Sequence, residues 1–78
     1  MLDLKQLLVD ITRAIVDQPD EITVTESANG DDILFEIHVS ESDMGKVIGR
    51  HGKNAKAIRS LMKTAANSVG KRVTVDIK

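Results

Sequence analysis

Two glycines three residues apart, Gly49 and Gly52, constrain this chain more than any other feature. A short helical pattern over about 43–48 precedes the first glycine, and a longer one over about 53–69 follows the second. Glycine adopts backbone conformations that other residues resist, and it lets another backbone approach closely. A tight turn that leads into a helix N-terminus also offers unpaired N–H groups and a positive dipole end to a phosphate. We therefore expect this turn to face a nucleic-acid backbone.

Length and composition limit what surrounds the turn. The 78 residues form one small domain, 1–78, with no room for a second core. Cysteine is absent, which excludes disulfides and thiolate metal sites. The first residues lack the basic start and unbroken apolar run of a signal peptide, and no segment has the length of a membrane-spanning helix. We expect a soluble cytoplasmic protein that does not contact membranes.

Charge is divided unevenly along the chain, although the formal net charge is only −1. Residues 1–43 contain eleven acidic and two basic side chains, whereas residues 44–78 contain nine basic side chains and one acidic. Such separation indicates a surface that attracts an anion. The alternative is that the two halves simply neutralise each other in the folded protein.

The first half has the pattern of a helix followed by a hairpin. Apolar residues recur at helical spacing over about 2–17, and Pro19 lies just beyond. The stretches 22–28 and 33–39 alternate as strands do, and Asn29-Gly30 between them is a strong turn signal. The second strand directs Ile33, Phe35, Ile37 and Val39 to one side, which we expect to face the core. A second apolar row on the helix either widens the core or contacts a partner; it consists of Leu2, Val9 and Val16.

The second half predicts two helices and a strand. The long helix has an apolar sector opposite its lysines, and Gly70 is a good C-terminal stop. The apolar sector consists of Ala55, Ile58, Leu61, Met62, Ala65, Ala66 and Val69. Residues 73–77 alternate as a final strand, which reaches the sheet through a two-helix crossover and should run parallel to the second strand. The prediction is an α+β fold in the order α-β-β-α-α-β, with a mixed three-stranded sheet packed on three helices.

This order, with Val47-Ile48-Gly49-x-x-Gly52 and Ile58 six residues further on, resembles the type II KH domain over nearly the whole chain. Within that family, the single-domain length and the run from Gly49 to Arg59 resemble the small stand-alone bacterial KH proteins of the KhpA group. Many KH domains have a larger aliphatic residue at the position of Ala55, and the alanine fits the KhpA group.

The resemblance implies binding of single-stranded RNA in a narrow groove, with the glycine turn clamping the backbone. The predicted polar RNA-binding residues are Gly49, Arg50, His51, Gly52, Lys53, Lys56 and Arg59. The predicted aliphatic floor is Val47, Ile48 and Ile58, with Ile37 as a further candidate, and each of these could instead be ordinary core. Because the one aromatic residue, Phe35, is assigned to the core, binding should be weak, salt-sensitive and of low specificity.

The resemblance also implies partners and a cellular role. It implies a homodimer, or a heterodimer with a larger KH-containing protein of the KhpB or Jag group, and an RNA-chaperone or regulatory role linked to cell-envelope growth and cell shape. Leu61, Met62 and the row on the first helix are candidate contacts. A second hypothesis is a protein-interaction adaptor that retains the KH fold with little RNA binding.

An enzyme is the third hypothesis, and the sequence argues against it. A phosphate-binding Walker loop requires Gly-x-x-x-x-Gly-Lys-Ser/Thr. If Gly52 and Lys53 were its Gly-Lys pair, the first glycine should lie five residues before Gly52, but Val47 is there and Lys46 precedes it, and Asn54 replaces Ser/Thr. No catalytic triad, carboxylate pair or metal-ligand cluster is visible. We therefore expect no catalytic residues, no metal and no cofactor.

Overall fold

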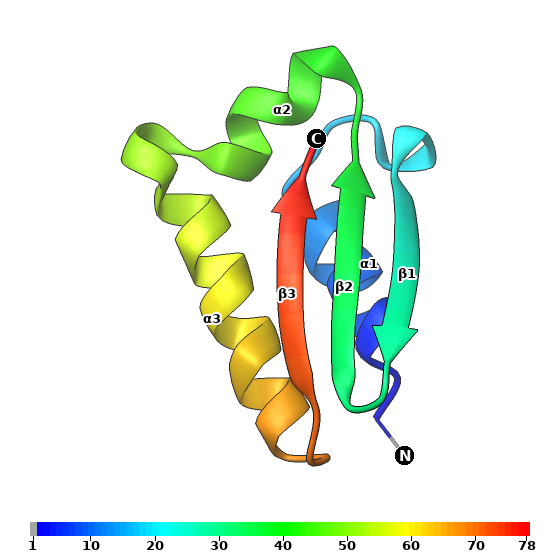
Figure 1. The fold of residues 1–78 in the computed structure, drawn as a ribbon. Coiled ribbons are helices and arrows are strands. Elements are labelled where there is room, and N and C mark those ends of the chain that lie inside the picture. The colour runs from blue at the N-terminus through cyan, green and yellow to red at the C-terminus, as the bar shows by residue number, and fades with distance from the viewer. Residues whose placement is uncertain (1) are drawn as a thin grey trace.

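The computed structural model describes residues 2–78 and has the predicted order of elements (Figure 1). Two short 3-10 turns, at Pro19–Glu21 and Arg50–Gly52, accompany the regular elements. The helices and strands are α1 (Leu4–Arg13), β1 (Thr23–Asn29), β2 (Asp32–His38), α2 (Glu41–Ile48), α3 (Lys53–Asn67) and β3 (Arg72–Ile77).

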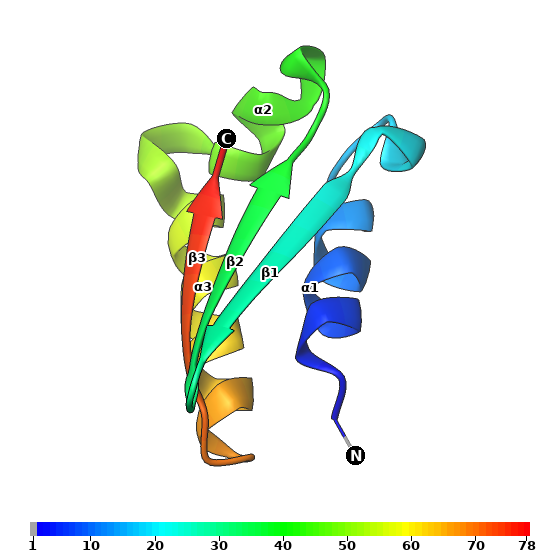
Figure 2. The ribbon, with the colours of Figure 1, turned by 45° about the vertical axis from the view of Figure 1, so that its right-hand side comes forward.

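The three strands form one mixed sheet in the order β1-β2-β3. β1 and β2 are antiparallel, with Asn29 opposite Asp32, and Gly30 in the connecting loop has a φ of +64°. β3 runs parallel to β2, which places Val75 beside Phe35. In Figure 1, α1 lies behind the sheet and α3 runs along its β3 edge, and the turned view of Figure 2 shows α3 passing behind β3 and β2. The α+β fold and the strand directions predicted from the sequence are confirmed.

The core lies between the sheet and the helices. Alternation along β2 predicted the inward side, and Phe35 and Ile37 are fully buried. On α3, however, Leu61 and Val69 are 49% and 37% exposed, so the buried stripe of this helix is narrower than its apolar sector. The buried apolar residues are Leu4, Leu8, Val24, Phe35, Ile37, Val47, Ala55, Ile58, Met62, Ala66 and Val75.

The first helix is shorter than the pattern over 2–17 predicted. α1 begins at Leu4, with Asp3 as its N-cap, and ends at Arg13. Beyond it, the N–H groups of Asp17 and Gln18 donate to the carboxylate of Asp43, at 3.1 and 2.9 Å. Two tertiary hydrogen bonds therefore satisfy N–H groups that a longer helix would have paired with its own carbonyls.

The ends of the two crossover helices, α2 and α3, differ little from prediction. α2 begins at Glu41, with Ser40 at the N-cap, although the Ser40 hydroxyl donates to Asp43 rather than capping a backbone N–H. α3 ends at Asn67, and Gly70 follows with a φ of +72°. The Lys71 N–H then donates to the Ala66 carbonyl at 2.9 Å, a hydrogen bond typical of glycine-terminated helices.

Candidate nucleic-acid interface

The turn between α2 and α3 has an unusual backbone. Gly49 has φ +76° and ψ 172°, a region that is essentially restricted to glycine. Gly52 has φ +75° and ψ 15°, and His51 is the one non-glycine residue with positive φ among residues 2–78, at +57°. Three of the four turn residues therefore adopt left-handed conformations, which explains why the sequence has glycines at both ends.

Gly49 is also constrained by a close neighbour. A Cβ on Gly49 would lie 2.7 Å from Asn54 Cγ and 2.8 Å from the Asn54 backbone nitrogen. A Cβ on Gly52 would instead enter open space, with no contact within 4 Å among the described residues. The first glycine is thus required by both conformation and packing, and the second by conformation alone.

The turn leaves the N-terminus of α3 available to a ligand. The N–H of Lys53 donates to the Arg50 carbonyl, and the N–H of Gly52 donates to the Gly49 carbonyl at 3.2 Å. The N-cap of α3 is Gly52, and within residues 2–78 no side chain caps this helix. The following N–H groups, together with the positive end of the helix dipole, are arranged as in sites that bind phosphate.

The cations of the second half fall into two groups. Four form ion pairs with acidic residues: Lys46 with Asp17, Lys71 with Asp31, Arg72 with Asp32 and Lys78 with Glu36. The remaining five form none within the described part of the chain, and all lie in the turn or on α3, which has no acidic residue. These five are Arg50, Lys53, Lys56, Arg59 and Lys63, here called the α3 cation strip. The two halves of the chain therefore neutralise each other only in part.

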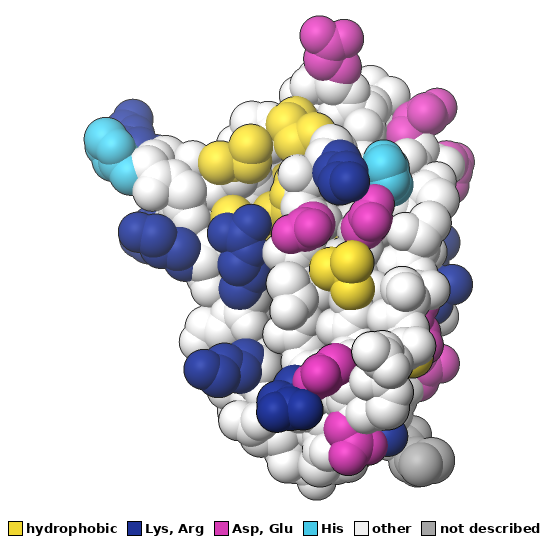
Figure 3. Space-filling view, in the orientation of Figure 1, with side chains coloured by type: hydrophobic (Ala, Val, Ile, Leu, Met, Phe, Trp, Pro, Cys, Tyr) yellow, Lys and Arg dark blue, Asp and Glu magenta, His cyan; other side chains and the backbone are white. Residues whose placement is uncertain are grey.

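The surface reflects this division. Figure 3 shows Lys and Arg side chains over the turn and α3, and acidic side chains over the sheet and the β1 side. Hydrophobic side chains gather between α2 and the C-terminal end of β3. Ile48 is 40% exposed, whereas Val47 and Ile58 are 0% and 2% exposed and Ile37 is fully buried. Of the predicted aliphatic floor, only Ile48 presents a substantial surface, and the other three support the site from the core.

Arg59 links α3 to the edge of the sheet. Its Nε donates to the carbonyl oxygen of Val75 at 3.1 Å. β3 is an edge strand, so alternate backbone groups point away from β2 and are free to pair with a ligand or side chain. Arg59, Ser60, Lys63 and residues 73–76 line a cavity of about 530 Å³ between α3 and β3. The predicted site residues thus lie along one side of the molecule, from the turn to this cavity.

Asp43 is a buried residue in the first turn of α2, the helix that precedes the glycine turn. From the sequence, it was predicted only to lie near the start of a helix. It is 1% exposed, and its carboxylate accepts hydrogen bonds from the N–H groups of Asp17 and Gln18 and from the Ser40 hydroxyl. Burial alone would raise the pKa of Asp43, but these hydrogen bonds and the nearby Lys46 charge outweigh burial and lower that pKa below its usual range. Asp43 therefore fixes the start of α2, the helix that leads into the turn.

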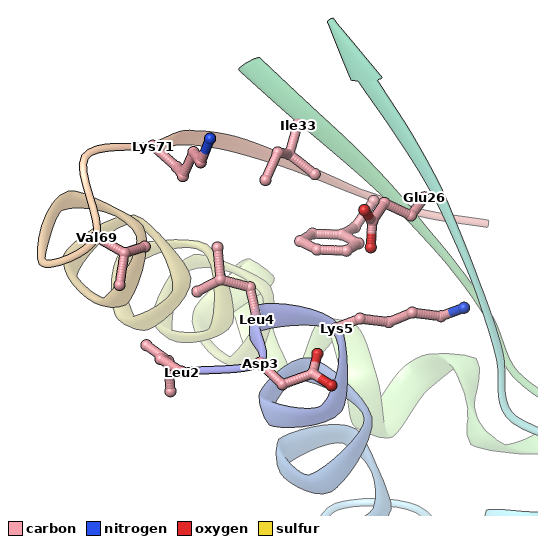
Figure 4. Close-up of a pocket in the computed structure, with 9 residues that line it drawn as sticks. Leu2, Asp3, Leu4, Lys5, Glu26, Ile33, Val69 and Lys71 are labelled. Atoms are coloured by element: carbon pink, nitrogen blue, oxygen red, sulfur yellow. The ribbon is translucent and has the colours of Figure 1, made fainter. Parts of the chain in front are cut away.

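An apolar pocket lies at the other end of α3 (Figure 4). It has a volume of about 440 Å³ and lies between the start of α1, the sheet and the α3–β3 connection. Its lining residues are Leu2, Asp3, Leu4, Lys5, Glu26, Ile33, Phe35, Val69 and Lys71. None of the predicted RNA-binding residues contributes to it.

Comparison with known proteins identifies the family. Residues 5–77 match the profile of the family described as KhpA/KhpB, KH domain. The chain belongs to this family. Its curated relatives include proteins named RNA-binding protein KhpA from Clostridium acetobutylicum and Halalkalibacterium halodurans, which are 49% and 43% identical to it. Both alignments cover 95% of this chain, and they cover 99% and 97% of the respective relatives. The family is not one of enzymes.

Solved structures of Era share the fold. The complex of Aquifex aeolicus Era with GDP and aluminium fluoride gives a TM-score of 0.62 at 24% identity, covering 99% of this chain and 31% of Era. An Era complex with nucleotides 1506–1542 of 16S ribosomal RNA gives a TM-score of 0.60 at 22% identity, covering 97% of this chain and 30% of Era. This chain thus spans about a third of Era, and at these identities the likeness concerns the fold.

The described residues hold neither of two other classes of site. Residues 2–78 contain no group of three or more His, Asp or Glu side chains arranged to hold a metal ion. None of the helices in the same range is long and apolar enough to cross a membrane.

Proposed function

We propose that this protein binds single-stranded RNA through the Gly49–Gly52 turn and the α3 cation strip. The observation that carries the proposal is the position of the five cations that have no acidic partner among residues 2–78, all in the turn or on the helix that follows it. Phosphates would contact the N–H groups at the start of α3 and the side chains of Arg50, Lys53 and Lys56. The names of the curated relatives and the KH family support RNA as the ligand.

The proposed binding depends mainly on phosphate contacts. Phe35 is the one residue among Phe, Tyr and Trp, and it is fully buried, so none of these three side-chain types is available for base stacking. Ile48 and the cavity beside Arg59 and Val75 would receive bases. Since contacts to the RNA backbone read no sequence, we expect low specificity and an affinity that falls as salt rises.

The double variant Arg50→Asp/His51→Asp should lose at least tenfold in affinity for short single-stranded RNA, because it replaces attraction to phosphate by repulsion. Both side chains are exposed, so the thermal unfolding temperature should change little. Asp also tolerates the left-handed conformation of His51 better than most residues do. Fluorescence anisotropy with a labelled RNA pool, measured at two salt concentrations, would test this.

A matched control lowers the net charge of the protein by the same amount, but on α1, away from the turn. Lys5→Asp/Arg13→Gln alters two exposed side chains of α1 and should leave RNA binding nearly unchanged. Equal RNA binding by the folded turn variant and by wild type would rule out the clamp and favour an adaptor that binds proteins instead.

We further propose that the protein acts in pairs in the cytoplasm, as a homodimer or with a larger KH-containing protein of the KhpB or Jag group. A second RNA site held close by raises the overall affinity of a weak module without any new contact. The resemblance to the KhpA group is the basis for this pairing, and for a chaperone or regulatory role in cell-envelope growth and cell shape. Leu61 is the more suitable contact of the two predicted on α3, because it is 49% exposed and Met62 is fully buried.

Leu61→Lys should weaken self-association, because it introduces a charge into an apolar contact, and sedimentation velocity over a concentration series would measure the effect. Leu2→Lys is the matched comparison, since Leu2 is 43% exposed and lies just before the chain's first helix. Val9 and Val16, the rest of that row, are half-buried against the core. If Leu2→Lys weakens association and Leu61→Lys does not, the contact lies on the α1 side.

A further inference from the structure

Asn54 joins the helices on either side of the turn. Its Nδ2 donates to the carbonyl oxygen of Lys46 at 2.7 Å. That carbonyl is among the last four of α2, which have no partner within the helix. The same side chain packs so closely on Gly49 that it leaves no space for a Cβ there. From the first turn of α3, Asn54 therefore contacts both the end of α2 and the turn.

The turn requires support of this kind. Left-handed conformations at a non-glycine residue such as His51 persist only where the surrounding structure holds them. The Gly49 N–H donates to the Gly45 carbonyl of α2 at 2.8 Å, whereas the backbone hydrogen bonds of Gly52 and Lys53 lie inside the turn. Among residues 2–78, the Asn54 amide makes the one side-chain hydrogen bond between α3 and α2. This contact therefore adds a polar link between the first turn of α3 and the end of α2, beside the core packing of Val47 and Ile58.

We propose that Asn54 is a positioning residue for RNA binding, which holds the turn in the shape that phosphates recognise without contacting RNA itself. The proposal rests on the function proposed above. Its physical basis is preorganisation: a turn that is already ordered loses less conformational freedom when RNA binds. Arg50, His51 and the free N–H groups of α3 would keep their chemistry without Asn54, but not their fixed arrangement.

The test is Asn54→Ala, which removes the amide and most of the packing on Gly49. We expect affinity for short single-stranded RNA to fall about three- to tenfold, the range for one lost hydrogen bond. The slope of log affinity against log salt should stay the same, because no charge is removed. The unfolding temperature should change little, because alanine has the higher helix propensity and offsets the lost hydrogen bond.

The matched control is Asn67→Ala, the same substitution at the exposed last residue of α3. It should leave RNA affinity unchanged. If Asn54→Ala binds RNA as tightly as this control, the positioning role is wrong. A loss of affinity that is explained by the fraction of unfolded Asn54→Ala protein would also overturn it, since the role would then be structural only.

A second measurement needs no RNA and separates this proposal from the RNA-binding proposal. NMR relaxation of the backbone amides of 50–52 should show order parameters near those of rigid backbone in wild type, about 0.85, and lower values in Asn54→Ala. Unchanged order parameters in a folded variant would overturn the positioning role. Lower order parameters would support it even if wild type and the Arg50→Asp/His51→Asp variant bound RNA equally, an outcome that would contradict only the RNA-binding proposal.

Discussion

Gly49→Ala should lower the free energy of unfolding by about 3–4 kcal/mol, a severe effect for one methyl group. A non-glycine residue at φ +76° and ψ 172° is strained, and its Cβ would lie 2.7–2.9 Å from three atoms of Asn54. One of these is the backbone nitrogen of α3, so no side-chain rotation relieves the contact. For a small domain near the lower end of protein stabilities, we expect a partly unfolded variant without RNA binding. Urea denaturation would measure the loss.

Two other glycines provide matched controls. Gly45 is inside α2, with ordinary helical backbone and nothing within 4 Å of a Cβ among the described residues. Gly45→Ala should therefore stabilise the protein by about 0.5–1 kcal/mol. Gly52→Ala should have an intermediate effect and lower the free energy of unfolding by about 1–2 kcal/mol. Alanine is strained in the left-handed conformation of Gly52, but its Cβ would make no close contact. Equal losses for Gly49→Ala and Gly52→Ala would show that packing against Asn54 is unimportant.

Local patterns were sufficient to predict the fold. Alternation in β2 identified Phe35 and Ile37 as core, and the turn signal at Asn29-Gly30 located the hairpin. Both signals depend on the residues themselves and their immediate neighbours. The parallel position of β3 followed from the length and handedness of the crossover, again without knowledge of any individual contact.

Contacts between distant residues could not be predicted in this way. Nothing near Asp43 in the sequence indicates that it accepts hydrogen bonds from N–H groups 25 and 26 residues away, beyond the end of α1. Arg59 was predicted as an RNA contact from the basic side of a helical wheel, which gives no sign of its hydrogen bond to Val75. The sequence showed Asn54 only as a mismatch to a Walker loop, because its partners lie on another helix and at the turn.

Asp43→Asn should lower the unfolding temperature by about 10 °C at pH 7, because an amide cannot replace a buried carboxylate that accepts three hydrogen bonds. The N–H groups of Asp17 and Gln18 would lose their charged acceptor, and α2 would keep only exposed contacts to the α1–β1 segment, such as the ion pair between Lys46 and Asp17. The matched control is Asp20→Asn, in the same segment. Asp20 is exposed and makes no side-chain hydrogen bond or ion pair within residues 2–78, so its substitution should have little effect. Thermal denaturation followed by circular dichroism would compare the two.

The pH dependence of this difference tests whether charge is the cause. The pKa of Asp43 is lower in the folded protein than its usual value, so the unfolded chain takes up the proton first as pH falls. The stabilisation by the carboxylate is therefore complete above the unfolded pKa, about 4, and is lost as pH falls through the lower folded pKa. Urea midpoints of wild type and Asp43→Asn should thus differ most near pH 7 and converge below about pH 4. Because both proteins share every other titrating group, a difference that stayed constant from pH 7 to pH 3 would show that the shape of the side chain, and not its charge, holds α2 in place.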